Sequence, residues 1–378
     1  MTYRLLPATL TATLIVGAAL VIFGERTARA EADVEAMVRV YNDSETLVIS
    51  PHARVSASVG HDSVVLGAGY AEDVVTSSST DVRSWSSKGT ISDLRREESG
   101  DVTFNLQNGS VTGYYIQSDE NDYHSQTYGL STTRDFFQKN TTLDLGVGLG
   151  IDNVQNDREL GYNAYLTHQS VTLGVTQVFS PVSIAQILYD FNAESGYLSG
   201  PYRVARLDQG DGTVIGIPEN SPASRIRNSL AFKYNHFFRS INSSLASTLR
   251  IYYDTWDVKS ATIEERLSHD YGKHFSMTYN VRFYQQGQAS FYQDKYNPNN
   301  LPVFFTGNKT LANYFTGLAG IRPEWHIGSG DWDTYVKVEY YIERFSNFTD
   351  VGNPTIASDD KLYSINALIL GAGFSGKF

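Results

Sequence analysis

Residues 363–378, at the end of the chain, read YSINALILGAGFSGKF and decide the fold class. Every second residue from Leu368 to Phe378 falls on one face, which is apolar or small and ends on an aromatic ring. The intervening residues, which begin at Tyr363, become small and polar toward the end. A repeat of two residues is that of a β-strand whose faces meet different surroundings. The segment is therefore predicted to be a two-faced strand.

The same end resembles the last strand of bacterial outer-membrane β-barrels, which ends on a C-terminal Phe that serves as an assembly signal. Phe374 and Phe378 are the candidate signal residues, and Gly376 stands where a bulkier apolar residue is more usual. The alternative, from this segment alone, is an amphipathic strand of a soluble β-protein. The rest of the chain decides between these interpretations.

Two other segments show the alternation over a greater length. In residues 274–286 one face is apolar and aromatic, whereas the other is polar and carries Arg282. In residues 332–343 the polar face holds Lys337 and Glu339 far inside the segment. These segments run roughly ten to fifteen residues, which a tilted strand needs to cross a bilayer, whereas strands of soluble proteins average about five or six.

The number and spacing of such segments predict a barrel. Sixteen segments follow one another from Val34 to the end of the chain, and single-chain bacterial barrels have even strand numbers. Short connections fall near residues 60–62, 107–110, 138–140, 180–181, 239–242, 271–273 and 328–331, and long ones near 72–94, 194–224, 287–310 and 346–360. We therefore predict an all-β, antiparallel transmembrane barrel of about 16 strands (range roughly 14–18), with short periplasmic turns and long extracellular loops.

The N-terminus carries the features of an export signal. Arg4 precedes an apolar run, and Ala28-Arg29-Ala30 offers a cleavage triplet, with Ala28 and Ala30 as its small residues. Residues 1–30 are therefore predicted to be a secretory signal peptide, and residues 31–378 the barrel. A single transmembrane anchor is the alternative for the apolar run. No later stretch reaches the ~18 apolar residues that a spanning helix needs.

The composition excludes several classes of site and of binding protein. The chain has no Cys, which excludes disulfides, Cys-ligated zinc, Fe–S clusters and covalently attached haem. Its formal charge is −11, and without residues 1–30 it retains 27 basic and 40 acidic residues, a charge of −13. That balance disfavours nucleic-acid binding. Mean hydropathy is −0.29, which is compatible with a transmembrane barrel because only half of each strand faces lipid.

Several segments together resemble a family of exported bacterial proteins that is known only as a domain of unknown function. They are residues 73–81 (DVVTSSSTD), 196–203 (GYLSGPYR) and 253–256 (YDTW), with Phe291 and Tyr292. The resemblance covers most of the mature chain. It implies an outer-membrane barrel and a location in the bacterial outer membrane, and it implies no activity and no catalytic residues.

Charged residues on the polar faces are the candidate functional residues. The predicted lumen-lining residues are Arg225, Arg227, Lys233, Arg250, Asp254, Arg282, Arg322, Glu324, Lys337, Glu339 and Glu343. If sixteen strands close, the interior is wide enough for an aqueous channel. Opposed charges across it would select small polar solutes. Alternatively, these charges neutralise one another in a wet interior that loops fill.

These patterns favour a porin-like channel for small hydrophilic solutes, with loops 194–224 and 287–310 folding inward as a constriction or plug. One alternative is a barrel that docks a periplasmic or surface partner, such as a redox protein, without conducting. A second alternative is an outer-membrane enzyme, although the chain lacks catalytic motifs. No cofactor or metal site is predicted. The expected partners are outer-membrane lipid, the barrel-assembly machinery acting through the last strand, and a further envelope protein.

Overall fold

A computed structural model describes residues 31–60, 62–77, 91–156, 159, 161–328, 331–350 and 361–377. The predicted signal peptide, with Ala28 and Ala30, lies outside the described residues, as does the terminal Phe378. Among the described residues, no helix has the length and apolar character to cross a membrane. The helical segments described are two short 3-10 turns, Pro298–Asn300 and Lys309–Leu311.

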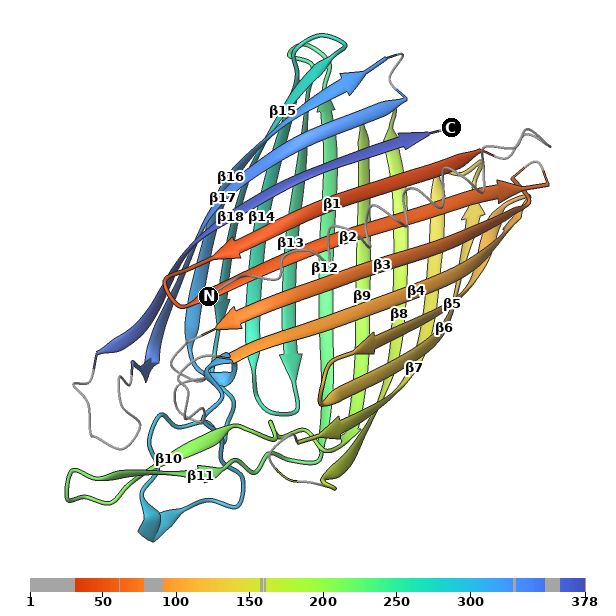
Figure 1. Ribbon diagram of the computed structural model, residues 1–378. Helices are drawn as coiled ribbons and strands as arrows, with labels where there is room; N and C mark the ends of the chain where they lie inside the picture. The colour runs from red at the N-terminus through yellow and green to blue at the C-terminus, as the bar shows by residue number, and fades with distance from the viewer. Residues whose placement is uncertain are drawn as a thin grey trace.

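Sixteen strands form one closed antiparallel barrel, in which each strand pairs with its neighbours along the chain and β1 pairs with β18 (Figure 1). The predicted fold and strand number are thereby confirmed. The barrel strands are β1 (Ala32–Asn42), β2 (Thr46–Val59), β3 (Val64–Ser77), β4 (Ile91–Leu106), β5 (Gly109–Asp119), β6 (Tyr123–Phe136), β7 (Thr141–Gln155), β8 (Asn163–Ser180), β9 (Ser183–Gly196), β12 (Ser224–Phe238), β13 (Ser243–Asp254), β14 (Lys259–Asp270), β15 (Phe275–Gln286), β16 (Tyr314–Ile327), β17 (Trp332–Thr349) and β18 (Leu362–Lys377).

Pairing of the first strand with the last closes the barrel. The register runs without interruption from Asp33–Lys377 to Asn42–Leu368. Because the bilayer core offers no water to unpaired N–H and C=O groups, a spanning sheet must close on itself. The predicted C-terminal strand is thus the element that completes the barrel, and Phe374 lies on its outward face beside Ala36.

Outward and inward residues of each strand differ in chemistry, as the alternation predicts. Outward residues are apolar and exposed, such as Leu249 on β13 at 47% and Val338 on β17 at 38%. The neighbouring positions Thr248 and Arg250 face inward. Exposed apolar side chains are stable in this position because lipid covers them. The barrel wall therefore has no apolar core on its inside along most of its length.

Two prolines lie inside barrel strands, and each interrupts one ladder. In β2, the register with β3 passes from Ile49 to His52 and leaves out Pro51. In β16, Pro323 pairs with β15, but the register with β17 leaves it out. Proline has no N–H to donate to a ladder. Strands β2 and β16 therefore each keep their pairing with one neighbour at the proline and lose it locally with the other neighbour.

The connections differ between the two ends of the barrel. The seven turns at the end where β18 finishes are short and include the Asn108-Gly109 turn, where Gly109 has a φ of +144°. All four connections predicted to be long lie at the opposite, extracellular end. The strands also extend further than predicted, since β3 reaches Ser77, β4 begins at Ile91 and β17 reaches Thr349.

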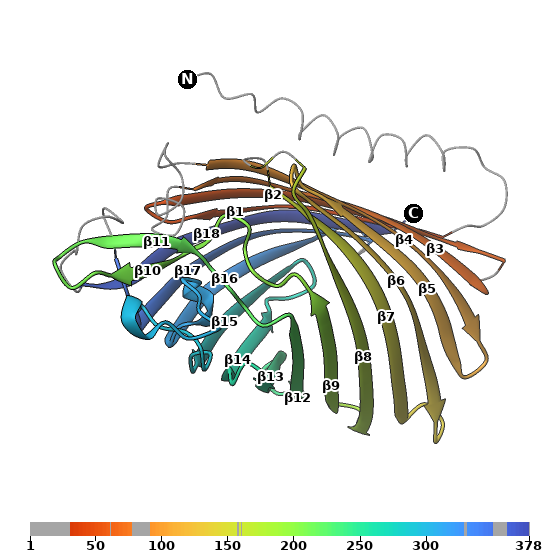
Figure 2. The ribbon, with the colours of Figure 1, turned by 90° about the horizontal axis from the view of Figure 1, so that it is seen from below.

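The loop between β9 and β12 contains a structure that the sequence analysis missed. Strands β10 (Val204–Asp208) and β11 (Val214–Pro218) form a separate two-stranded hairpin. Its strands are only five residues each, and their apolar residues are too few to stand out by periodicity. Figure 2 shows this hairpin lying across the ends of β16–β18, away from the strands that lead into it.

The assignment of faces predicts a clear difference between two adjacent substitutions. We expect Leu249→Arg to lower the free energy of unfolding by about 2–4 kcal/mol, because it places a charge against lipid near the middle of a strand. Thr248→Arg, one residue away on the inner face, should lower it much less. Urea unfolding of the refolded barrel in lipid vesicles, followed by Trp fluorescence, measures both. Equal losses for the two variants would contradict the assignment.

Candidate functional site

The inner wall of the barrel holds all the predicted lumen-lining residues, on the inward face of β12–β17. Many of them form ion pairs with neighbours on the same wall. The pairs are Arg225–Asp254 at 2.5 Å, Arg227–Glu194 at 2.7 Å, Arg322–Glu324 at 2.7 Å and Lys337–Glu339 at 2.8 Å. Glu343 accepts a hydrogen bond from the Tyr341 hydroxyl. Part of the wall charge is therefore neutralised within the wall.

The Arg225–Asp254 pair belongs to a network that holds the turn between β13 and β14. Asp254 is buried and accepts hydrogen bonds from the Tyr252 hydroxyl at 2.6 Å and from the Trp256 N–H at 2.9 Å. The Arg225 guanidinium lies 4.3 Å from the centre of the Trp256 ring. This network explains the YDTW segment of the sequence as a structural turn. Asp254 is thus fully engaged and is not a free lumen charge.

Other predicted residues keep their charge available. Within the described part of the chain, Lys233, Arg250 and Arg282 have no carboxylate at ion-pair distance. Arg250 lines an inner concavity of about 380 Å³ between β9 and β15, together with Arg227 and Asp190. A guanidinium that has no protein partner remains free to meet a solute anion.

Acidic residues dominate the opposite wall, a feature that the sequence analysis did not single out. The inward carboxylates of β3–β8 are Asp73, Asp93, Glu97, Asp101, Asp135, Asp144 and Asp152. In the strand order, β4 is opposite β14, so these carboxylates face the arginine-bearing strands across the barrel. Walls of opposite sign produce an electric field across the interior. The closed strand order, which no single segment specifies, creates this arrangement.

One inward group combines a hydroxyl, an imidazole and a carboxylate. Thr127 Oγ1 lies 3.1 Å from His168 Nε2, and His168 Nδ1 lies 3.5 Å from Asp152 Oδ2. The His168 ring lies over Gly150, where a Cβ would come within 1.9 Å of it. A hydroxyl, an imidazole and a carboxylate in this order are the groups used in nucleophilic catalysis. However, the main-chain N–H groups of these residues take part in the sheet ladder and do not form an oxyanion hole. Sequence reasoning missed this group because its members come from three strands.

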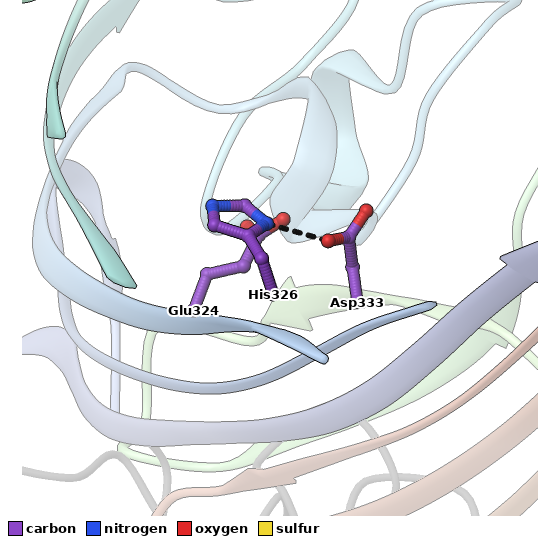
Figure 3. A group of neighbouring side chains, drawn as sticks. All are labelled: Glu324, His326 and Asp333. Atoms are coloured by element: carbon purple, nitrogen blue, oxygen red, sulfur yellow. Dashed lines mark hydrogen bonds and ion pairs between the residues drawn. The ribbon is translucent and has the colours of Figure 1, made fainter. Parts of the chain in front are cut away.

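Another group could supply metal ligands at the periplasmic end of β16 and β17. Glu324, His326 and Asp333 bring one ligand atom each to within 4.8 Å of one another (Figure 3). However, His326 Nδ1 and Asp333 Oδ1 share a hydrogen bond of 2.5 Å, and Glu324 pairs with Arg322. These contacts satisfy the three side chains without an ion. We therefore interpret the group as part of the ion-pair network of the wall.

Two loops cover part of the extracellular opening. This extracellular cover consists of residues 197–223, which include the hairpin, and residues 287–313. The two loops are joined by main-chain hydrogen bonds between Arg206 and Tyr296 at 2.8 Å and between Asn220 and Phe305 at 2.9 Å. In addition, the buried Glu219 carboxylate accepts a hydrogen bond from Thr306 Oγ1 at 2.6 Å. The loops thus behave as one unit.

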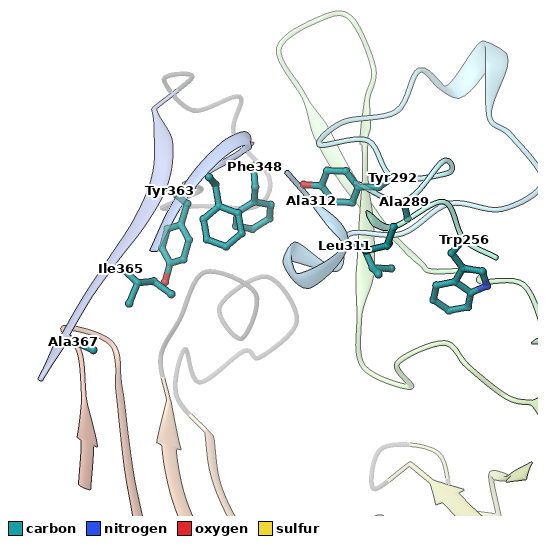
Figure 4. Packing of buried hydrophobic residues seen from close by; sticks show 11 residues of the cluster. Trp256, Ala289, Tyr292, Leu311, Ala312, Phe348, Tyr363, Ile365 and Ala367 are labelled. Carbon is teal, nitrogen blue, oxygen red and sulfur yellow. The ribbon is translucent and has the colours of Figure 1, made fainter. Parts of the chain in front are cut away.

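The cover packs on an apolar cluster at the rim of the barrel. Tyr292 and Leu311 from the cover lie among inward residues of β17 and β18, including Phe345 and Tyr363 (Figure 4). Burial raises the pKa of Tyr292 above its ordinary value, so this hydroxyl stays protonated. The rings of Phe345 and Tyr363 are in contact at a tilt of 41°, with their centres 5.7 Å apart. Hydrophobic burial of this kind is the main stabilising term available to a surface loop.

A buried arginine fastens the cover to the barrel. Arg206 on β10 is 5% exposed and forms an ion pair with Asp294 of the second loop. Its Nη2 also donates to Thr349 Oγ1 at the end of β17, at 3.1 Å, and the guanidinium lies 5.7 Å from the centre of the Phe348 ring. The hairpin is thereby tied to β17, which is not a neighbour of β9 or β12 in the barrel. Whether the two loops act as the predicted constriction or plug stays a prediction.

The comparisons with known proteins identify the family. The family model described as protein of unknown function (DUF3570) matches residues 68–355. The chain belongs to the DUF3570 family. The resemblance drawn from the sequence is thereby confirmed. A search of curated proteins finds no match for this DUF3570 member.

Solved structures confirm the fold of the DUF3570 chain. A bacterial polysaccharide outer membrane secretin is similar, with a TM-score of 0.51 and 11% identity over 92% of this chain and 98% of that chain. CdiB from Acinetobacter baumannii has a TM-score of 0.51 and 10% identity over 92% of this chain and 60% of that chain. These structures share its fold. The closed sixteen-strand barrel with its exposed apolar outer face places this DUF3570 protein in the bacterial outer membrane.

The segments that suggested the DUF3570 family meet at the extracellular end. Residues 197–203 enter the cover, residues 253–256 form the turn after β13, and Phe291 packs edge-on against Trp256 with ring centres 5.1 Å apart. Residues 73–77 end β3, and 78–81 lie outside the described residues. Residues 197–203, residues 253–256 and Phe291 therefore belong to the cover or to the turn against which it packs.

The role of Arg206 in the DUF3570 barrel leads to a test. We expect Arg206→Met to destabilise the docked cover by about 1.5–3 kcal/mol, because it removes the charged hydrogen bonds that this buried guanidinium makes to Asp294 and Thr349. Proteinase K should then cut residues 204–218 of the folded barrel faster. Gln209→Met is the control, since this exposed residue lies near the tip of the same hairpin, where a substitution removes no buried contact. Unchanged cleavage in the Arg206 variant would contradict the fastening role.

Proposed function

We propose that the protein is a channel of the bacterial outer membrane for small hydrophilic solutes. The observation that carries this proposal is the inner wall, where free arginines on β13 and β15 face carboxylates on β3–β8 in a closed sixteen-strand barrel. Barrels of this strand number are wide enough for water. A wall that only had to fill the interior would have no use for unpaired charges, because an uncompensated charge is stable only in contact with water.

The cover supports a channel with a restricted extracellular entrance. It lies over the ends of β16–β18 and is fixed there by Arg206 and by the apolar cluster (Figure 2). The cover also contacts the acidic wall at the start of β8, where the Tyr197 N–H donates to the Tyr165 main-chain oxygen at 2.9 Å. We expect a solute to enter beside the cover and to pass between the two charged walls.

A docking scaffold is the second candidate function. It is favoured by the apolar residues at the outer tip of the second loop, where Val303 is 75% exposed and Phe304 is 40% exposed. Exposed apolar patches at such sites serve as binding surfaces for other proteins. A scaffold of this kind would hold an envelope partner and would not need to conduct.

Single-channel recording separates the two candidates. The refolded mature protein should give steady current steps in a planar bilayer that separates two KCl solutions of different concentration. Arg250→Glu should shift the reversal potential toward cation selectivity, because it reverses a free charge on the inner wall. Arg239→Glu, in the periplasmic turn after β12, is the charge-matched control and should shift it much less. A folded, heat-modifiable barrel that gives no steps would refute the channel and favour the scaffold.

A further inference from the structure

A second concavity of the inner wall gathers four cations. It encloses about 340 Å³, and its basic lining residues are Arg39 on β1, Arg266 on β14, Arg282 on β15 and Lys337 on β17. The register explains why residues so distant in sequence meet. Arg39 is opposite Gly371 of β18, and Gly371 is opposite Lys337. The closure of the barrel therefore creates this site.

The charges of this concavity do not balance. It contains two carboxylates, Glu264 and Glu339. Glu264 pairs with Arg266 at 2.8 Å, and Glu339 pairs with Lys337 at 2.8 Å. Arg39 and Arg282 have no carboxylate at ion-pair distance among the described residues. The concavity is left with two uncompensated positive charges.

Glycines keep the concavity open. A Cβ at Gly320 would lie 2.5 Å from Cγ of Glu339 and 2.9 Å from the main-chain oxygen of Val338. The Glu339 side chain therefore lies flat over this glycine, where it is only 3% exposed and accepts a hydrogen bond from Asn280 at 2.9 Å. Because Glu339 is held against the wall, it does not reach across to neutralise Arg39 or Arg282. Gly371 adds no side chain of its own to the same floor.

We propose that this concavity binds small organic oxyanions that carry two negative charges. A guanidinium presents planar N–H donors that match carboxylate and phosphate oxygens. Two such groups, Arg39 and Arg282, match the two charges of a dianion, and the volume of about 340 Å³ accepts a molecule of a few carbon atoms. Leu318 and Ile369 also line the concavity and offer apolar surface to a carbon skeleton. The site rests on the proposed channel function, for which it would select dicarboxylates or phosphate esters as solutes.

The experiment uses succinate as the probe in single-channel recordings of the full barrel. Succinate should interrupt the KCl current of the wild type, and neutral succinamide should not. Arg39→Gln and Arg282→Gln should each weaken this block about tenfold or more, since a hydrogen bond to a charged group contributes roughly 1.5–3 kcal/mol. Arg239→Gln removes the same charge from the periplasmic turn after β12, outside both concavities, and should retain the block.

The outcomes separate the site from the channel. A conducting barrel that succinate blocks equally in the wild type and in both variants overturns the site and leaves the channel standing. Equal block by succinamide overturns it too. If the folded barrel gives no current, calorimetric titration of succinate into the detergent-solubilised protein decides the question. Binding that is lost in Arg282→Gln then supports the site without a channel, and no binding overturns it. Inorganic phosphate, titrated in the same way, shows whether the carbon skeleton contributes.

Discussion

The pairing of β1 with β18 is the interaction on which the rest of the structure depends. In a bilayer core, a sheet edge leaves N–H and C=O groups without partners, and each costs several kcal/mol. Ten consecutive residue pairs, from Asp33–Lys377 to Asn42–Leu368, remove that edge. The same pairing places Arg39 beside Gly371 and so completes the inner wall. The last sixteen residues of the chain therefore determine both the stability of the barrel in lipid and the composition of its interior.

Closure also determines where apolar packing is found. The outer face is apolar against lipid and most of the inner wall is polar. Among the described residues, the larger of two buried apolar clusters forms where the inner face turns apolar, around Phe345, Tyr363 and Ile365 near the extracellular rim. The cover docks on this surface, and Arg206 joins the two loops to β17. The cover is thereby fixed to the barrel at β17, and a main-chain hydrogen bond from Tyr197 to Tyr165 also joins it to β8.

The inner wall shows how charge can be kept available inside a membrane protein. Paired residues such as Lys337 and Glu339 lie flat over glycines, whereas Arg250 and Arg282 have no partner in the described wall. An unpaired guanidinium is stable there only in water, so these residues imply a hydrated interior. The opposed carboxylates of β3–β8 and the local excess of arginine on β1 and β15 are the features on which the proposed channel and its proposed anion site rest.

The sequence by itself determined the two-residue alternation, the sixteen strands, the difference between short and long connections, and the faces on which residues such as Arg282 and Glu339 lie. These properties repeat locally along the chain, so they can be read from neighbouring residues. Only the tertiary structure decided which charges meet. Arg39 and Arg282 line the same concavity, and Asp254 accepts hydrogen bonds that hold a turn. The β10–β11 hairpin contacts β17 through Arg206. These contacts depend on strand register and barrel closure, which bring together residues hundreds of positions apart.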